Sequence, residues 1–383
     1  MRIAMLGTRG VPARYGGFET AVEEIGKRLV TRGHEVTVYC RNGADSGRHH
    51  YLGMRLVHLP CVKGKAVETL SHTALSALHL LTHPRHDVAI VFNAANAPFL
   101  PLLRLTRTPV AVHVDGLEWR RAKWGGAGRS YYRWAESYVV HWADALIADA
   151  QGIADYYMEE FGAATELLTY GAPIQTSPSS DRLPELGVSP KSFHLVVARF
   201  EQENHVEEIV AGYRNSRAEL PLLVVGSAPY ADAYTARVRQ AAGSDPRIRM
   251  LGGVWDQDLL DQLYANCLTY LHGHSVGGTN PSLLRAMGAG ADVIAFDVDF
   301  NREVLGEFGR YFSSLGDIAP LLFAAEVLPE EAVGRGVHFR TRAANRYDWL
   351  EVAAGYEQLC KQLDSGESTR GTASGLLRQP ARA

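Results

Sequence analysis

The stretch from Tyr270 to Asp297 reads YLHGHSVGGTNPSLLRAMGAGADVIAFD and predicts a strand, a loop, a helix and a second strand in close succession. The apolar runs 268–271 and 292–296 are typical of short buried strands. Asn280 is suited to cap the helix, and Pro281 to begin it, because a first-turn residue needs no N–H. Unpaired N–H groups at such a helix N-terminus favour the binding of a phosphate. The alternative is an ordinary connection between two strands, which has the same sequence pattern.

Composition sets the class of protein. The chain has 383 residues, 46% of them hydrophobic and 21% charged, which is typical of a globular protein and favours two domains. A net charge of −3 disfavours a general nucleic-acid binder. The four cysteines are scattered, which favours buried, reduced thiols. With neither a signal peptide nor a run of about 18 apolar residues, we expect a cytoplasmic location.

The first 40 residues form one predicted strand–helix–strand unit. Strand 2–6 leads through a loop rich in Gly and Arg, residues 7–17, into a helix over 18–32 and a strand over 35–40. The loop lacks G-x-G-x-x-G spacing, and no acidic residue follows the second strand. A nicotinamide cofactor is therefore disfavoured.

The glycine-rich loop is itself a candidate anion site. Arg9 and Arg14 are expected to lie in the same crevice as Gly16 and Gly17. Two arginines beside exposed backbone amides suit a phosphate or a carboxylate. The alternative is a surface loop with solvated arginines.

A second set of candidates follows the strand predicted over 109–114, after an amphipathic helix predicted over 68–82. His113, Asp115 and Glu118 lie at or after the carboxyl end of that strand, where function gathers in parallel sheets. They are candidates for acid–base work or hydroxyl binding. The alternative is that each is a satisfied structural group.

The segment Trp119–Trp134 mixes five cationic side chains with five aromatic ones. Such a face suits an anionic membrane surface or a lipid pyrophosphate. It also suits single-stranded nucleic acid, and an ordinary solvated helix has a similar composition.

From 174 to 191 the composition turns to Ser, Pro and charge, which is typical of a linker. The alternation of strands and helices resumes at residue 193. Two α/β domains joined by a linker imply a cleft between them, and such clefts host ligands.

Several long motifs resemble those of the two-domain family 4 glycosyltransferases of GT-B fold, and within them a bacterial rhamnosyltransferase-like branch. The resemblance covers Arg2 to about Leu363 and rests on the segments 7–20, 115–124, 170–172, 201–204 and 272–284. It implies an α/β fold of two Rossmann-like domains with parallel sheets facing a central cleft. It also implies transfer of a sugar, for this branch rhamnose, from a nucleotide diphosphate donor to an acceptor hydroxyl, with retention and with neither metal nor cofactor.

The resemblance also implies boundaries. They are an acceptor-side domain (1–173), a linker (174–191), a nucleotide-sugar domain (192–347), a helix bracing the first domain (348–364) and a disordered tail (365–383). The acceptor would be a glycan or a lipid-linked glycan of the cell envelope, met at the inner face of the membrane. No nucleic acid is expected as a partner.

Residue by residue, the resemblance places the donor against both domains. The donor-binding residues it implies are Gly16, Gly17, Arg199, Asn204, Gly226, Trp255, His274, Gly277, Gly278, Thr279, Asn280, Ser282 and Arg285. The implied acceptor-side residues are Arg9, Arg14, Tyr15 and Trp119, with Asp115, His113 and Glu118 as candidate catalytic groups. Amides, a helix N-terminus and Arg199 would meet the charge that develops on the leaving diphosphate.

The chain departs from the family pattern at three positions. An acidic pair spaced Glu-x7-Glu falls on Gly277 and Arg285, and the usual pyrophosphate lysine is Asn204. Arginine cannot accept the hydrogen bonds of ribose hydroxyls. We therefore expect Arg285 either to contact a phosphate or to signal an altered donor, such as a thymidine nucleotide. Two alternatives stay open: a degenerate relative that binds a nucleotide sugar without turnover, and a GT-B enzyme of non-glycosidic chemistry.

Overall fold

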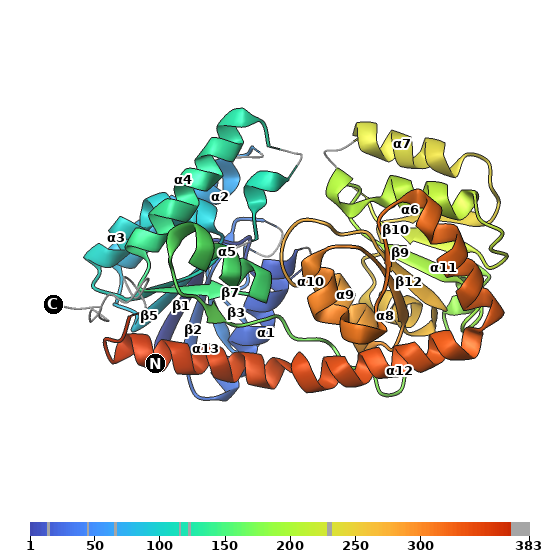
Figure 1. Cartoon of the computed structure of the whole chain (residues 1–383). Helices are drawn as coiled ribbons and strands as arrows, with labels where there is room; N and C mark the ends of the chain where they lie inside the picture. The colour runs from blue at the N-terminus through green and yellow to red at the C-terminus, as the bar shows by residue number, and fades with distance from the viewer. Residues whose placement is uncertain are drawn as a thin grey trace. The chain divides into compact units, whose positions relative to one another are not determined.

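The structure, a computed structural model, describes residues 1–13, 16–43, 46–64, 67–114, 116–121, 124–227 and 232–368. The chain divides into two compact units. Unit 1 comprises Met1–Tyr170 together with the segment that begins at Trp349, and unit 2 comprises Gly171–Asp348 (Figure 1). Each unit is a sheet with helices packed on it, so the α/β prediction is confirmed in both.

Unit 1 is built on an eight-stranded sheet in the order β3-β4-β2-β1-β5-β6-β7-β8. Neighbouring strands are parallel except for the β3–β4 pair. The strands are β1 Arg2–Leu6, β2 Glu35–Arg41, β3 His50–Tyr51, β4 Met54–Leu59, β5 Val88–Phe92, β6 Val110–His113, β7 Ala145–Ala148 and β8 Glu166–Leu167. The helices are α1 Gly17–Thr31, α2 Val67–Thr82, η1 Ala94–Phe99, α3 Leu100–Leu105, η2 Glu118–Arg120, α4 Gly126–Trp142, α5 Gln151–Phe161 and α13 Trp349–Asp364.

Unit 2 has a six-stranded, wholly parallel sheet in the order β11-β10-β9-β12-β13-β14. Its strands are β9 His194–Val197, β10 Leu222–Val225, β11 Ile248–Gly252, β12 Thr269–His272, β13 Asp292–Phe296 and β14 Arg310–Phe312. Its helices are η3 Leu183–Leu186, η4 Gln202–Asn204, α6 Val206–Arg214, α7 Asp232–Ala242, α8 Gln257–Asn266, α9 Pro281–Gly288, α10 Asp299–Leu305, η5 Gly306–Phe308, α11 Leu315–Val327 and α12 Pro329–Arg346.

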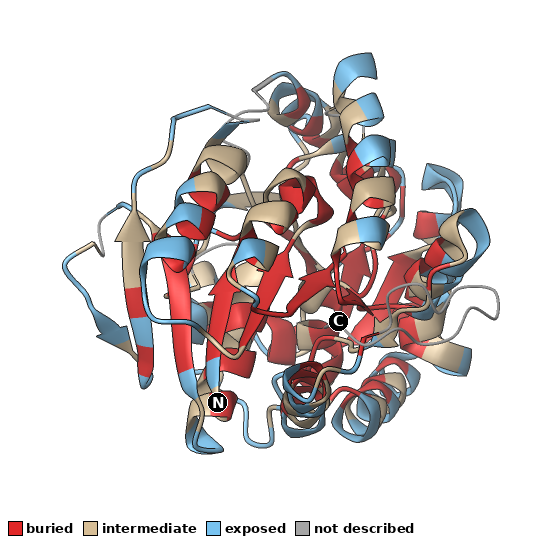
Figure 2. Ribbon diagram, turned by 90° about the vertical axis from the view of Figure 1, so that its left-hand side faces the viewer, coloured by how far each residue is buried: buried red, intermediate tan, exposed pale blue. Residues whose placement is uncertain are grey.

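The core of each unit lies where the sheet meets its helices. In unit 1 the apolar side chains of β1, β5, β6 and β7 are buried against the inner faces of the covering helices. Figure 2 shows buried residues concentrated in the central strands of the sheet. Parallel strands buried on both faces need near-continuous apolar runs, and these are the runs from which the strands were predicted. A corresponding cluster fills unit 2.

The residues predicted as a linker pack against unit 2. Arg182 donates its backbone N–H to Gln262 Oε1 at 3.0 Å, and Leu183 is fully buried. At the other end of the chain, Ser368 Oγ donates to the carbonyl of Asp144 in unit 1 at 2.8 Å. The remainder of the predicted tail, 369–383, lies outside the described residues.

The helix predicted over 68–82 is present as α2, and it buries polar side chains together with the apolar Ala77 and Leu80. His72, Thr73 and Ser76 are fully buried on its inner side. Leu75 and Leu78 are exposed on its outer side. The sequence prediction did not specify the buried face, because hydrophobic periodicity alone does not say which side of a helix meets the sheet.

The last helix, α13, packs against α1 within unit 1 and is anchored there by one carboxylate. Glu357 accepts a hydrogen bond from Arg32 at 3.0 Å, lies 3.0 Å from His34 Nε2 and forms an ion pair with Lys361 at 2.7 Å. The hydrogen bonds from Lys361 and His34 hold the pKa of Glu357 at about 2. A carboxylate with a depressed pKa stabilises the fold above its unfolded-state pKa, and this stabilisation is lost as pH falls toward the folded value.

We expect Glu357→Gln to lower the thermal midpoint by a few degrees at pH 6 and by much less at pH 2.5. Thermal melts of both proteins across that range measure the difference. Glu351→Gln, at an exposed position on the same helix, is the control and should show little change with pH. A Glu357→Gln difference that stays constant down to pH 2.5 would contradict this assignment.

Candidate functional site

The candidate site in unit 2 lies where the strand order of its sheet reverses. The chain moves outward in one direction from β9 through β10 to β11, and in the other from β12 through β13 to β14. Ligands of open parallel sheets bind outside the carboxyl ends of the strands at such a switch point. The loops that follow β9 and β12 carry most of the predicted donor-binding residues.

The loop after β12 ends in a capped helix, as predicted. Asn280 Oδ1 accepts from the backbone N–H of Ser282 at 2.9 Å and from its hydroxyl at 2.8 Å. Ser282 Oγ also lies 3.1 Å from the hydroxyl of the buried Tyr270. The cap prediction is confirmed, and these contacts fix the direction in which the N-terminus of α9 points.

A side-chain pair joins the loop after β9 to the loop after β12. Asn204 donates through Nδ2 to the carbonyl of Arg199 at 2.8 Å, so its Oδ1 is the atom that faces His274. His274 Nδ1 lies 2.8 Å from that oxygen and must therefore carry the proton it donates. Both side chains are buried. The pair positions the backbone of Arg199 relative to the 273–280 loop.

Close backbone contacts leave no room for a side chain at two glycines of this region. A Cβ on Gly273 would lie 2.0 Å from the carbonyl oxygen of Asn204, and a Cβ on Gly226 would lie 1.8 Å from the carbonyl oxygen of Ala198. Gly277 has a φ of +133°, a conformation that residues with a side chain rarely adopt. The backbone of the loop thus requires glycine at the position where the family pattern has its first acidic residue.

We expect Gly273→Ala to lower the kcat/KM for donor turnover about 100-fold, because the loop must shift away from Asn204 and a displacement near 1 Å has this effect on a positioned site. Steady-state kinetics of nucleotide diphosphate release would measure it. Gly316→Ala is the matched control, since the nearest atom to a Cβ there is a serine hydroxyl at 3.6 Å. Equal kinetics for the two variants would show that the Gly273 contact does not position the site.

The other predicted donor residues of unit 2 lie around this loop and sheet edge. Arg199 follows β9 and pairs with Glu201 at 3.4 Å. Thr279 is buried within the loop, whereas Trp255 follows the edge strand β11 and is 63% exposed. Gly278 lies between Gly277 and Thr279 in the same loop.

Arg285 is held by the neighbouring helix α8. Its Nε donates to Asp261 Oδ1 at 2.8 Å and its Nη1 donates to Gln257 Oε1 at 2.9 Å. Its guanidinium carbon also lies 5.6 Å from the centre of the Tyr264 ring. The side chain is therefore engaged in linking α9 to α8 in this structure, and contact with a phosphate would require it to leave Asp261.

One residue that the sequence did not single out supports the same loop. Asn301 is fully buried and donates through Nδ2 to the carbonyl of His274 and to that of Phe296, both at 2.9 Å. It lies in α10, which follows the carboxyl end of β13. A polar residue soon after a buried strand is the signal that would have identified it.

In unit 1 the glycine-rich loop is held by acidic residues of the helix that follows it. The backbone N–H of Arg9 donates to Glu19 Oε1 at 3.1 Å, and that of Ala13 donates to Glu23 Oε2 at 2.7 Å. In this structure these two N–H groups are therefore bonded to carboxylates, and the amides predicted to face an anion are those of Gly16 and Gly17. Gly16, with a φ of +113°, precedes Gly17 at the start of α1, and Arg14 and Tyr15 lie outside the described residues.

His113 ends β6 in an aromatic environment. Its ring stacks with Phe92 and Tyr170 at centroid distances of 5.6 and 5.9 Å, and Phe18 meets it edge-on at 5.1 Å. Burial lowers the pKa of His113 to about 4, so the ring is neutral at pH 7. Among the described residues neither ring nitrogen has a hydrogen-bond partner. A neutral imidazole here can bind a hydroxyl but is a poor acid; the neighbouring Asp115 lies outside the described residues.

Two further predicted residues of unit 1 are engaged by their neighbours. The buried carboxylate of Glu118 pairs with Arg121 at 2.5 Å and accepts from Trp124 Nε1 at 3.2 Å. The Trp119 ring lies beneath the guanidinium groups of Arg120 and Arg133, at 5.2 and 5.1 Å. These contacts favour the structural alternative for Glu118, namely ordering the segment after β6.

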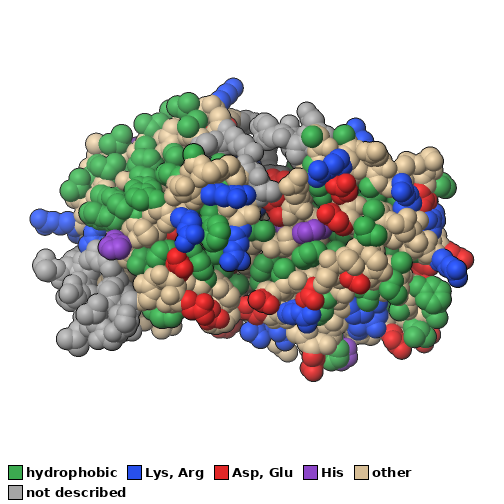
Figure 3. All heavy atoms as spheres, turned by 45° about the horizontal axis from the view of Figure 1, so that its top comes forward, with side chains coloured by type: hydrophobic (Ala, Val, Ile, Leu, Met, Phe, Trp, Pro, Cys, Tyr) green, Lys and Arg blue, Asp and Glu red, His purple; other side chains and the backbone are tan. Residues whose placement is uncertain are grey.

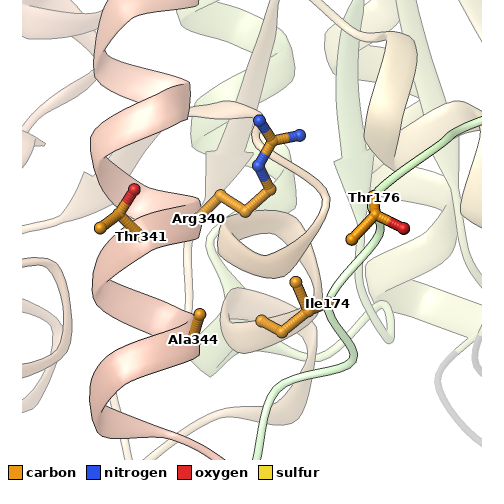
Figure 4. A pocket seen from close by; sticks show the side chains of 5 residues that line it. All are labelled: Ile174, Thr176, Arg340, Thr341 and Ala344. Carbon is orange, nitrogen blue, oxygen red and sulfur yellow. The ribbon is translucent and has the colours of Figure 1, made fainter.

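A pocket of about 320 Å³ lies elsewhere in unit 2, between α12 and the segment 174–176 near the start of the unit (Figure 4). Its lining residues are Ile174, Thr176, Arg340, Thr341 and Ala344. Arg340 spans it and donates to the carbonyl of Gln175 at 3.4 Å. It contains none of the predicted site residues.

Comparison with known proteins defines the class to which this geometry belongs. Residues 16–171 match the model of the glycosyl transferase 4-like domain, and residues 193–328 match that of glycosyl transferases group 1. Sucrose-phosphate synthase from Thermosynechococcus elongatus has the same fold, with a TM-score of 0.81 and 19% identity over 95% of this chain and 99% of that one. HepE from Anabaena, solved with UDP-glucose, has a TM-score of 0.76 and 16% identity over 95% and 100%.

The two domain matches together span most of the chain, which belongs to the glycosyltransferases of GT-B fold. Among curated relatives it is similar to a phosphatidyl-myo-inositol mannosyltransferase of Mycobacterium leprae, 28% identical over 52% of this chain and 54% of that protein. The chain spans about a third to a half of the length of the curated relatives that it matches. In the part of the chain that the structure describes, no helix is both long and apolar enough to cross a membrane.

Proposed function

We propose that the chain transfers a sugar from a nucleotide diphosphate donor to an acceptor hydroxyl. The bond between the anomeric carbon and the diphosphate breaks, a bond from that carbon to the acceptor oxygen forms on the same face of the sugar, and the hydroxyl proton goes to the leaving phosphate. The observation that carries the proposal is the placement of Arg199 and the capped N-terminus of α9 at the switch point of a glycosyltransferase domain.

Charge compensation in this proposal comes from the protein. The N–H groups of α9 and the Arg199 guanidinium would stabilise the charge that develops on the diphosphate, without a metal ion. The neutral ring of His113 would bind a hydroxyl of the sugar or of the acceptor, with Asp115 as the second candidate catalytic group.

The donor base and the acceptor class are part of the proposal. HepE was solved with UDP-glucose, which makes a UDP-sugar the first donor to test. The rhamnosyltransferase-like motifs favour dTDP-rhamnose as the second. The mannosyltransferase relative is named for a lipid acceptor, which supports a lipid-linked glycan at the cytoplasmic face of the membrane here.

The experiment incubates the purified chain with UDP-glucose, dTDP-rhamnose or GDP-mannose, with and without a cell-envelope lipid extract and in the presence of a chelator. We expect nucleotide diphosphate release from one donor, increased by the extract, and an NMR spectrum of the product that shows retained anomeric configuration. An inverted product would contradict the stereochemistry proposed. Loss of all activity on chelation would contradict metal independence.

A second candidate is a protein that binds a nucleotide sugar without turnover. The observation that favours it is the pair of departures at Gly277 and Arg285, since the structure holds Arg285 on Asp261 and requires glycine at 277. Tight nucleotide binding with no release from any donor would support this candidate. Arg285→Glu tests the altered-donor hypothesis; an unchanged donor ranking led by UDP-sugars would contradict it.

A further inference from the structure

The outer surface of α2 is apolar although the helix buries polar residues. Val67, Leu75, Leu78 and Leu81 are all exposed. At 3.6 residues per turn they fall within about a third of the helix circumference, on the side away from the sheet. The inner side of the same helix carries buried polar residues, His72 among them, and the pKa of His72 is lowered to about 4 by burial. A helix so oriented leaves an apolar stripe that the described residues do not cover.

The next two helices continue this surface. α3 contacts α2 and α4, and its last residue, Leu105, is 71% exposed. On α4, Trp134 is 45% exposed and begins a ladder of rings. Trp134 stacks on Tyr138 at a centroid distance of 4.8 Å, and the Trp142 ring lies tilted against Tyr138 at 5.8 Å. Figure 3 shows hydrophobic side chains gathered over the end of unit 1 that carries α3 and α4. We call Leu75, Leu78, Leu81, Leu105 and Trp134 the apolar face.

The stretch of sequence that contains the apolar face has an excess of positive charge. Residues 62–134 contain ten Lys and Arg against four Asp and Glu, in a chain whose net charge is −3. Arg85 and Arg107 are exposed just beyond the ends of α2 and α3, and Arg85 donates to the Arg107 carbonyl at 2.6 Å. Glu68 pairs with Arg41 outside this stretch. Three of the ten cations are paired as well: Arg104 with Asp144, Arg121 with Glu118 and Arg133 with Glu160.

We propose that the apolar face docks on an anionic phospholipid bilayer. The apolar face has the features of a surface that lies in the membrane interface. These are leucines on the outer sides of two helices, a ladder of Trp and Tyr rings, and cations at the edge. Rings with an apolar body and a polar tip suit the headgroup level. The surface differs from the predicted segment 119–134, in which Trp119 is half-buried beneath two arginines and only Trp134 is shared.

The proposal rests on the lipid-linked acceptor of the proposed function, but it is tested without donor or acceptor. Flotation measures binding of the full chain to vesicles of equal parts phosphatidylglycerol and phosphatidylcholine, and to vesicles of phosphatidylcholine alone. We expect at least tenfold stronger binding to the anionic vesicles, because each cation near the surface strengthens binding severalfold. We expect Leu78→Ser/Leu105→Ser/Trp134→Ser to weaken binding at least tenfold and Arg85→Gln/Arg107→Gln to weaken it less, in a salt-dependent way.

The matched control is Phe323→Ser/Val327→Ser, which removes two equally exposed apolar side chains from α11 of unit 2. It should bind vesicles like the unaltered chain. Thermal melts check that all variants are folded, and donor hydrolysis without lipid should be the same in the triple variant. Absence of anionic preference, equal loss in the control, or concentration-dependent dimerisation through this face without vesicle binding would each overturn the proposal. Vesicle binding without donor turnover would instead count against the proposed function alone.

Discussion

Arg199→Ala is expected to lower the kcat/KM for turnover of the sugar donor by about 10²–10³-fold. This is the usual effect of removing one hydrogen-bonding group that stabilises transition-state charge. Arg199 follows β9 at the switch point of unit 2, and the Asn204 amide holds its carbonyl at 2.8 Å. A guanidinium in this position can bond two phosphate oxygens at once. Its loss would act most strongly as negative charge accumulates on the leaving diphosphate.

Steady-state kinetics over a range of donor concentrations separate kcat from KM in this experiment. Arg199→Lys retains the charge but loses the two-pronged geometry, so we expect an intermediate rate. Arg237→Ala is the control, since that arginine pairs with Glu207 on the surface at 3.0 Å. If Arg199→Ala and Arg237→Ala were equally active, the phosphate role of Arg199 would be refuted.

Asp292→Asn is expected to lower the free energy of unfolding by about 3–5 kcal/mol, which is the usual cost of breaking a buried ion pair by removing one partner. The fully buried Asp292 carboxylate, at the start of β13, forms ion pairs with Arg310 of β14 and, at 3.0 Å, with Arg335 of α12. Burial raises the pKa of Asp292, and the two guanidinium groups oppose that rise. Removing the carboxylate would leave the largely buried Arg310 without its anion and Arg335 with only the exposed Glu331, at 3.6 Å.

Urea denaturation followed by circular dichroism measures this loss in the transition that includes unit 2. Asp297→Asn is the matched control, because Asp297 also pairs with an arginine, Arg302 at 2.5 Å, but on the surface. Exposed pairs contribute little, so that variant should unfold nearly like the unaltered chain. Replacing Asp292 together with Arg310 and Arg335 by Leu, Met and Met should recover much of the loss. Equal stability of the two asparagine variants would show that the buried cluster does not stabilise unit 2.

The strands, the helix starts and the fold class were predictable because their signals are local. An apolar run bounded by Gly or Pro indicates a buried strand from within a few residues. Asn280 caps α9 through a contact with Ser282, two residues away. The family motifs added the pairing of two Rossmann-like domains, and the domain matches and solved structures confirm that fold.

Contacts between distant segments were not predictable in the same way. Asn204 and His274 are 70 residues apart in sequence and meet only because β9 and β12 are neighbours in the sheet. Arg285 looked like a ligand-binding change in the sequence, whereas α8 supplies it with Asp261 as a partner. The carboxylates that occupy the amides of Arg9 and Ala13 likewise come from the following helix.

The sequence by itself therefore determined the order of strands and helices, the capped helix after β12 and the family, since each depends on residue type within one turn or one motif. Only the tertiary structure decided which side of α2 is buried, which glycines lie too close to a carbonyl for a side chain, and which charged residues already have partners. These properties depend on how strands and helices from distant parts of the chain are ordered and packed. Residue periodicity describes only neighbouring residues and carries no information about which distant segments meet.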